Sequence, residues 1–319
     1  MYKNEPIFLQ PTFHERIWGG SKLKAEFQYP IPSEKTGEAW VISAHPHGPS
    51  TITNGELKGK TLLDAWNDHG ELFNRKDGKK GEYPLLVKIL DANHDLSVQV
   101  HPDDEFARKV ENEPYGKTEC WYVLSAEEDA ELILGHHAET EEEFDRMVEN
   151  GEWDKLLRRV KVKAGDFFYV PSGAIHAIGK GTVILETQQS SDITYRVYDY
   201  DRVDANGNKR ELHLDKARQV TNIPHEDVKT EKKVTTTGGL TETMLIDEQY
   251  FTVYHWNLDG ETTKDLTGDF LQVSVIDGQA DLLLGGNRFE LKKGMNFILP
   301  YGTEEFRLEG KAQLIVSHP

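Results

Sequence analysis

The chain has 319 residues, of which 37% are hydrophobic and 10% aromatic, a composition typical of a folded protein with room for two domains. Its 55 acidic residues outnumber its 37 lysines and arginines. The resulting formal charge of -18 disfavours binding to nucleic acid or to an anionic membrane surface. If the substrate is an anion, its attraction must come from local positive charge.

Two further features bear on the cellular compartment. No apolar run approaches the length of a membrane-spanning helix, and the first residues lack the basic and apolar pattern of a secretory signal. The single cysteine, Cys120, excludes an internal disulfide, and its alternation away from Glu119 favours a core thiol over a ligand or a nucleophile. We expect a cytoplasmic protein.

Strand-like segments dominate the chain, and glycine, proline and aspartate residues separate them, as in β-sandwiches and barrels. Runs of apolar, β-branched and aromatic residues predict strands over residues 39–43, 85–90, 96–100, 120–124, 130–134, 167–170, 182–187 and 193–198.

Helical patterns are fewer. Residues 61–66 and 103–110 predict short helices, the second with acidic residues in its first turn. Thr140 and Glu143 have the spacing of a capping box and open a helical pattern that continues to Leu157. We interpret this last segment as a small helical insertion in a barrel.

Two predicted strands carry polar groups on one face. Side chains two residues apart share a face of a strand, so Ser97, Gln99 and His101 point together, away from the intervening valines. In the next strand Lys117 and Glu119 likewise share a face, which aims an ammonium group and a carboxylate together. Trp121 has the same phase, but we interpret it as a core residue.

His176 follows a Pro-x-Gly turn after the strand predicted over residues 167–170. Imidazole, carboxylate and amide oxygen together form a mixed nitrogen and oxygen site that suits zinc or another divalent transition metal. The conjunction of these groups with the turn spacing predicts four metal-ligand candidates, Gln99, His101, Glu119 and His176.

An internal repeat indicates two similar domains. Three residues of the first copy recur at a constant offset of 129 residues (294 minus 165), with Gly165, Pro171 and Gly173 matching Gly294, Pro300 and Gly302. The second copy has Glu305 in place of His176, so it is predicted to be metal-free. The threonine-rich segment 220–239 is the best linker candidate. We therefore predict a metal-binding domain at 1–230 and a second, metal-free domain of similar fold at 231–319.

The spacing from Gly165 to His176 is the second motif of the cupins, which are jelly-roll β-barrels. With Gln99-x-His101 and Glu119 in place of the usual cupin ligands, the chain resembles the type I mannose-6-phosphate isomerases. Further segments carry this resemblance, at residues 18–20, 37–40, 85–88, 96–103 and 117–119. It covers most of residues 7–200 and resembles the short bacterial form.

The resemblance implies a mainly β protein with two cupin-type jelly-roll barrels and one Zn²⁺ per chain. It also implies interconversion of mannose 6-phosphate and fructose 6-phosphate, by metal-assisted proton transfer between carbons 2 and 1 through an enediolate. The expected partner is a small sugar phosphate, and the chain is expected to be a monomer or a homodimer.

Eight further residues are candidates for the reaction. The proposed catalytic residues are Lys117, as a base with a depressed pKa beside a cation, Glu186, by resemblance, and Arg196, which would orient an anionic oxygen. The proposed substrate-binding residues are Trp18, Glu38, Lys88, Ser97 and Asp192. Phosphate contacts are not transferred from the long-chain members, because the sequence after Arg196 departs from theirs.

Several of these residues also have a purely structural interpretation. Lys117 could simply pair with a carboxylate, and Arg196 could form a surface ion pair with Asp192. Trp18 could be a packed aromatic, and Lys88 could be a strand residue whose stem is buried while its head reaches water.

One alternative concerns the metal, and two concern the function. A metal that only fixes the fold would take no part in the isomerisation. A cupin oxygenase would need redox-active iron, against which Gln99 and Lys117 argue. A non-enzymatic sugar-binding cupin would bind ligand without turnover.

Overall fold

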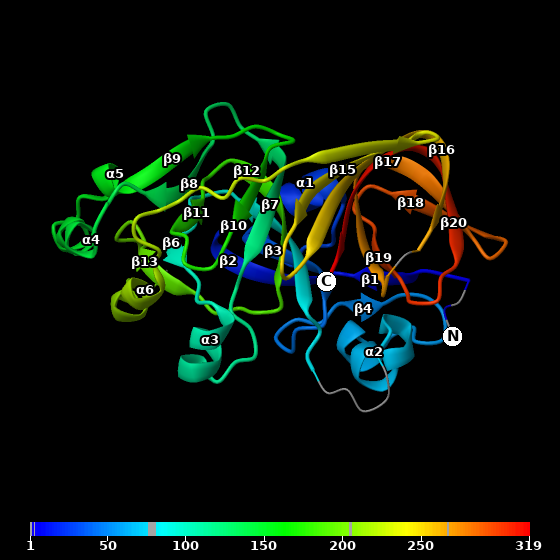
Figure 1. Ribbon diagram of the computed structural model, residues 1–319, viewed down its shortest axis with the longest axis horizontal. Coiled ribbons are helices and arrows are strands. Elements are labelled where there is room, and N and C mark those ends of the chain that lie inside the picture. The colour runs from blue at the N-terminus through cyan, green and yellow to red at the C-terminus, as the bar shows by residue number, and fades with distance from the viewer. Residues whose placement is uncertain (1, 3, 76–80, 204–205, 267) are drawn as a thin grey trace.

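The computed structural model describes residues 2, 4–75, 81–203, 206–266 and 268–319. The strands form three antiparallel sheets, and Figure 1 shows two strand-rich halves side by side along the long axis of the molecule. The prediction of a mainly β protein is confirmed. Within the described residues, no helix has the length and apolar character needed to cross a bilayer.

The first half is built from two facing sheets. The six-stranded sheet has the order β10 (Phe167–Val170), β7 (Glu119–Ala126), β12 (Thr182–Gln189), β5 (Leu85–Ala92), β3 (Thr36–Ser43) and β2 (Thr12–Gly20). The five-stranded sheet has the order β13 (Tyr195–Tyr198), β6 (Val98–Val100), β11 (His176–Ile178), β8 (Glu131–His136) and β9 (Leu157–Lys161). Each of the eight predicted strand segments overlaps one of these strands.

A buried apolar cluster fills the space between these two sheets. Ile184 of β12 and Trp121 of β7 come from the six-stranded sheet, and Leu132 of β8 and Ile178 of β11 come from the five-stranded one. Since alternate side chains of a strand face opposite sides, the same strands can carry this core and also present polar groups next to it.

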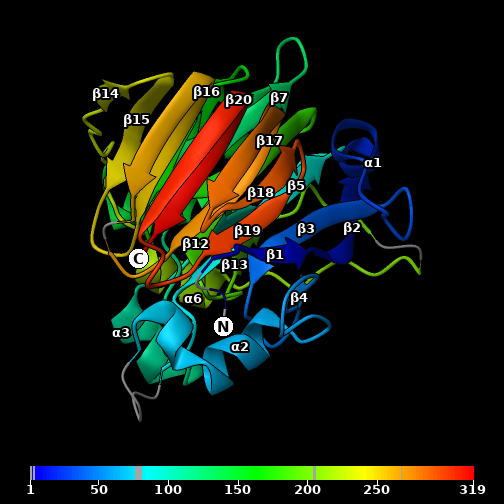
Figure 2. The ribbon, with the colours of Figure 1, turned by 90° about the vertical axis from the view of Figure 1, so that its right-hand side faces the viewer.

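The second half is one nine-stranded sheet that curves around its own core (Figure 2). Its order is β14 (Lys233–Thr237), β15 (Leu240–Asp247), β16 (Thr252–Asp265), β20 (Glu305–His318), β17 (Leu271–Leu284), β19 (Asn296–Leu299), β1 (Ile7–Gln10) and β4 (Thr51–Ile52), with β18 (Asn287–Lys292) paired to β17. Gly260 of β16 lies opposite Gly310 of β20, with φ angles of 121° and 135°. This glycine pair lets the long strands bend where other residues would be strained.

The N-terminal strand belongs to the sheet of the second half. In β1, Ile7 lies opposite Ile298 of β19, and Leu9 lies opposite Ile52 of β4. One buried cluster also joins apolar side chains from both halves, among them Ile42, Leu85, Phe251, Ile298 and Ile315. The division near residue 230 stays a prediction, and the two halves share sheet and core across it.

Helices occupy the connections: α1 (Lys22–Phe27), α2 (Leu62–Asp68), η1 (Gly70–Phe73), α3 (Asp104–Phe106), the π-helical η2 (Ala107–Glu111), α4 (Glu141–Glu149), α5 (Trp153–Leu156) and α6 (Leu214–Val220). The Thr140 side chain accepts a hydrogen bond from the Glu143 backbone N–H at 3.2 Å, which caps α4. Because α4 and α5 lie between β8 and β9, the predicted helical insertion is confirmed.

The internal repeat recurs in three dimensions. Strand β10 in the first copy corresponds to β19 in the second, and the turn after each contains a left-handed glycine, Gly173 at φ 82° and Gly302 at φ 84°. Glycine adopts this conformation without the steric cost that a Cβ would add. The spacing of glycines and proline therefore encodes the same strand and turn twice.

A buried hydrogen bond joins the halves and predicts a measurable loss of stability. The Tyr83 hydroxyl donates to Gln272 Oε1 at 2.7 Å, and both side chains are almost fully buried. Tyr83→Phe leaves that oxygen without its donor, so the free energy of unfolding should fall by about 1–3 kcal/mol. Denaturant unfolding measures the change, with Tyr301→Phe at an exposed tyrosine as control. Equal stability of both variants would show that the bond does not tie the halves together.

Candidate active site

The predicted metal ligands come from both sheets of the first half. Glu119 starts β7 in the six-stranded sheet, whereas His176 starts β11 and His101 follows β6 in the five-stranded one. The Glu119 carboxylate lies 3.5 Å from His101 Nε2 and 3.4 Å from His176 Nε2, and all three side chains are buried. Gln99 lies directly opposite His176 across the β6 and β11 pair, so both side chains share one face.

Backbone carbonyl groups fix the tautomer of both histidines. His101 Nδ1 lies 2.8 Å from the Ile193 oxygen, and His176 Nδ1 lies 2.8 Å from the Ala174 oxygen. A carbonyl oxygen only accepts, so each Nδ1 carries the proton and each Nε2 presents a lone pair beside Glu119. His176 Nε2 is buried without a hydrogen-bond partner. This is the arrangement by which proteins orient histidine ligands, and the residues present fit a divalent metal.

Burial keeps these imidazoles neutral. It lowers the pKa of His176 to about 4 and holds the pKa of His101 well below its ordinary value, with help from the positive charge of Lys117. A neutral imidazole is the form that binds a metal, so the triad is available as a ligand set near neutral pH.

Lys117 lies against the triad. Its Nζ is 2.8 Å from Glu119 Oε2 and 3.2 Å from His101 Nε2. Burial opposes its charge, but Glu119 and Glu186 outweigh burial and raise the pKa of Lys117. The depressed pKa expected for Lys117 depends on a neighbouring cation, whereas the two carboxylates act in the opposite direction, so the depression stays a prediction for the metal-loaded protein.

A row of side chains crosses the six-stranded sheet beside the triad. Glu186 of β12 lies opposite Trp121 of β7 on one side and Lys88 of β5 on the other. Trp121 Nε1 donates to Glu119 at 3.0 Å and to Glu186 at 3.2 Å, while Lys88 Nζ lies 3.3 Å from Glu186. Burial, with repulsion from Glu119, raises the pKa of Glu186. Trp121 is buried as predicted, and it also orients both carboxylates.

A cavity of about 450 Å³ opens above this row. Every predicted catalytic and substrate-binding residue lines it, together with Gln99: Trp18, Glu38, Lys88, Ser97, Lys117, Glu186, Asp192 and Arg196. Five basic side chains line it (Arg16, Lys88, Lys117, Arg196 and Arg210), against three acidic ones (Glu38, Glu186 and Asp192). An acidic protein thus has a locally basic cavity, as an anionic substrate requires.

Arg196 differs from the other two arginines of the cavity. Its Nε donates to Ser97 Oγ at 3.3 Å and its Nη1 to the Glu211 carbonyl at 2.8 Å. Arg16 pairs with Glu38 and Arg210 pairs with Asp199, but Arg196 has no carboxylate partner among the described residues. The alternative of an ion pair between Arg196 and Asp192 is wrong, because Asp192 pairs with His47 instead. Arg196 thus has positive charge available for an anion.

Sequence reasoning missed several cavity residues. Trp40 had a local signal, since it shares a strand face with Glu38, to which its Nε1 donates at 2.7 Å. Burial works against ionisation of Glu38, but Lys88, Arg16 and this bond lower its pKa to about 2. Arg210 lies outside any strand and has no local pattern that could have identified it.

The facing sheets, the buried triad and the polar cavity define a cupin whose centre can hold a metal ion. Residues 7–142 match the phosphomannose isomerase type I catalytic domain, and residues 241–319 match the mannose-6-phosphate isomerase cupin domain. The chain belongs to the type I phosphomannose isomerase family.

Individual relatives agree with this assignment. The probable mannose-6-phosphate isomerase GmuF of Bacillus subtilis is 52% identical over 314 residues, covering 98% of this chain and 99% of that protein. Mannose-6-phosphate isomerase ManA of the same organism is also 52% identical over 98% of this chain and 99% of its own length. A crystal structure of mannose 6-phosphate isomerase from Bacillus subtilis has a TM-score of 0.95 at 49% identity, covering 98% and 99% of the two chains.

The triad predicts the behaviour of two single variants. His101→Ala or His176→Ala removes one imidazole ligand, so divalent metal should bind at least about tenfold more weakly. Metal content after dialysis, measured by elemental mass spectrometry, gives the result. His137→Ala, at an exposed histidine, is the control. Retention of one tightly bound ion per chain in either triad variant would place the metal elsewhere.

Proposed function

We propose that this chain interconverts mannose 6-phosphate and fructose 6-phosphate in the cavity above the triad, with one zinc ion per chain. The observation that carries the proposal is the convergence of His101 Nε2, His176 Nε2 and Glu119 on one buried point beneath a basic cavity. Gln99 is the fourth proposed ligand, because it lines the same cavity opposite His176.

The proposed ligand set contains only one negatively charged group. Zinc held by one carboxylate and three neutral groups would keep net positive charge and act as a Lewis acid toward the sugar oxygens. The protein contributes the orientation of this set, through the carbonyl groups that hold both imidazoles and through Trp121, which donates to Glu119. A neutral amide at Gln99 preserves positive charge that a carboxylate there would cancel.

Arg196 is the proposed contact for the anionic end of the substrate. Its guanidinium is anchored by Ser97 and by the Glu211 carbonyl, which leaves Nη2 without a partner among the described residues. Guanidinium groups bind phosphate oxygens with strong, oriented hydrogen bonds. Ser97 is then a positioning residue for Arg196 as well as a proposed substrate contact.

Lys117 and Glu186 are the proposed proton carriers between carbons 2 and 1. Both side chains line the cavity. Lys117 lies beside Glu119, and Glu186 accepts a hydrogen bond from Trp121. The raised pKa of Glu186 brings a carboxyl group closer to the range where it can both accept and donate a proton. Lys88 holds Glu186 from the other side, while Trp18 and Glu38 form the proposed walls for the sugar.

A coupled assay of mannose 6-phosphate conversion tests the proposed function. It should be run on native, chelator-stripped and zinc-restored protein. Activity that disappears on stripping and returns with zinc supports both the reaction and the catalytic metal. Activity that survives verified metal removal would make the metal structural. Absence of turnover in folded, fully metallated protein would reject the isomerase.

Variants separate the two proton carriers. Lys117→Met should keep the bound metal and lower kcat about 100-fold or more, since a positioned acid or base contributes about 10²–10⁴ in rate. Glu186→Gln is the matched comparison, because it removes the other candidate and conserves shape. Turnover at the wild-type rate in Lys117→Met, with loss in Glu186→Gln, would assign the proton transfer to Glu186 alone.

Arg196→Met should raise the KM for mannose 6-phosphate by about 10 to 100-fold, because a hydrogen bond to a charged group contributes about 1.5–3 kcal/mol. Steady-state kinetics measure the change. Arg288→Met, in β18 of the second half, is the control for loss of an arginine. An unchanged KM in Arg196→Met would move the phosphate contact to another side chain of the cavity.

A further inference from the structure

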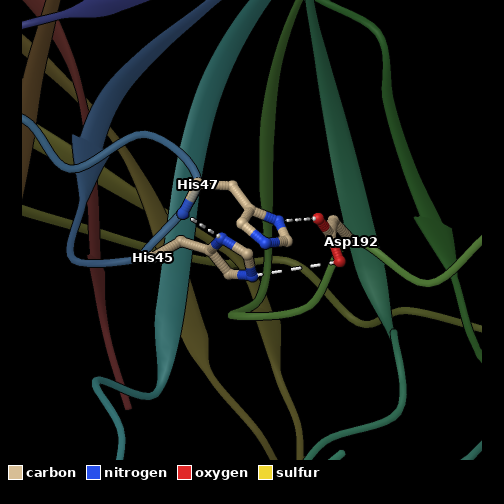
Figure 3. A group of neighbouring side chains, drawn as sticks. All are labelled: His45, His47 and Asp192. Carbon is tan, nitrogen blue, oxygen red and sulfur yellow. Dashed lines mark hydrogen bonds and ion pairs between the residues drawn. The ribbon is translucent and has the colours of Figure 1, made fainter. Parts of the chain in front are cut away.

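His45, His47 and Asp192 form a cluster that shares no residue with the proposed metal site (Figure 3). His47 lies in the connection between β3 and β4, and Asp192 lies in the connection between β12 of the six-stranded sheet and β13 of the five-stranded one. His47 Nδ1 lies 2.6 Å from Asp192 Oδ2, whereas His45 Nε2 is 4.0 Å from Asp192 Oδ1. Both His47 and Asp192 line the cavity.

The hydrogen bonds of His45 argue against a second metal site. Its Nδ1 accepts the backbone N–H of His47 at 3.2 Å, so this nitrogen carries a lone pair. Burial lowers the pKa of His45, which favours the neutral ring, and the ring proton must then lie on Nε2. An Nε2–H facing Asp192 cannot coordinate a cation. In this arrangement His45 presents an N–H group, and not a lone pair, to Asp192.

His47 has the opposite tautomer. Asp192 accepts from its Nδ1–H, so the neutral form of the ring has its lone pair on Nε2, which has no hydrogen-bond partner within the part of the chain that is described. An imidazole whose one nitrogen is held by a carboxylate, with the other nitrogen free, is a general base with a fixed orientation. The carboxylate also stabilises the imidazolium that forms when Nε2 takes up a proton.

The reaction needs such a group at a step before isomerisation. Mannose 6-phosphate is predominantly a cyclic hemiacetal, and transfer of hydrogen between carbons 2 and 1 requires its open aldehyde. Ring opening moves a proton from O1 to O5. An imidazole suits this task because it accepts and donates near neutral pH.

Other ionisable groups of the cavity are engaged elsewhere. Glu38 is held as a carboxylate by Arg16 at 2.8 Å and by Trp40 at 2.7 Å. Lys117 contacts Glu119, and Lys88 contacts Glu186. His14 also lines the cavity, but its Nε2 is buried and its ring packs on Trp40 with the centroids 4.3 Å apart. His47 differs from these groups, because Asp192 holds its Nδ1 while its Nε2 has no hydrogen-bond partner among the described residues.

We propose that His47, positioned by Asp192, opens and closes the sugar ring, an inference that rests on the proposed isomerase function. Nε2 takes the O1 proton as the C1–O5 bond breaks and the C1–O1 carbonyl forms. The imidazolium then returns the proton to O5. No electrons are gained or lost, and one nitrogen can serve both oxygens in turn because both are attached to C1.

Anomer exchange tests this assignment directly, because ring opening interconverts the α and β anomers without transfer of a carbon-bound hydrogen. Two-dimensional exchange NMR on metal-loaded protein, at equilibrium with mannose 6-phosphate and fructose 6-phosphate, gives the enzyme-catalysed rate. His47→Asn should lower this rate at least about tenfold. Asp192→Asn should lower it in the same direction, since a neutral amide does not stabilise the imidazolium. Both variants should keep the wild-type metal content.

His137→Asn, at an exposed histidine away from the cavity, is the matched control and should exchange anomers at the wild-type rate. Wild-type anomer exchange in His47→Asn overturns the proposal, even if turnover falls. Loss of exchange in His14→Asn but not in His47→Asn would also overturn it. A second equivalent of zinc that binds wild type but not His47→Asn would make the cluster a metal site. Failure of the isomerase itself appears separately, as absent turnover of wild type in the coupled assay.

Discussion

The functional half of this protein depends on the contacts that stabilise the buried carboxylate of Glu119. A carboxylate without water requires partners, and the fold supplies them from both sheets: two imidazole nitrogens, the Lys117 ammonium and the Trp121 N–H. Lys117 and Trp121 belong to the same stretch of chain as Glu119, whereas both imidazoles come from the five-stranded sheet. Closure of the two sheets and assembly of the reactive centre are therefore one event, since a shift of either sheet would separate Glu119 from both imidazoles.

Charge is distributed on two scales in this isomerase. The whole chain carries a formal charge of -18, yet the cavity is lined by more basic than acidic side chains. The two scales serve different ends, since overall charge keeps the surface away from polyanions while the cavity attracts a small one. Within the cavity, most cations are already paired with carboxylates. Arg196, held by neutral groups, is the one available to a phosphate group among the arginines that line it.

The sequence was informative where function follows local periodicity. Period-two alternation predicted that Gln99 and His101 share one face of a strand, and the turn spacing added His176 to the same site. In the structure His176 of β11 lies opposite Gln99 of β6. Interactions between distant strands could not be predicted this way. Glu119 and, from a separate strand, Glu186 raise the pKa of Lys117, and the partner of Asp192 is His47, which is 145 residues away in the chain. Sequence spacing shows which side chains share one face of a strand. The pKa values and ion pairs depend on which strands and loops the fold brings together.

The position of β1 has a consequence for how the chain is made. One edge of β1 pairs with β4 early in the sequence, but its other edge pairs with β19, so Ile7 has no partner there until Ile298 has been synthesised. During synthesis from the N-terminus, β1 therefore presents unpaired N–H and C=O groups until β19 has emerged. A nascent chain in this state is exposed to pairing with another copy. Pairing of β1 with β19 ends that exposure.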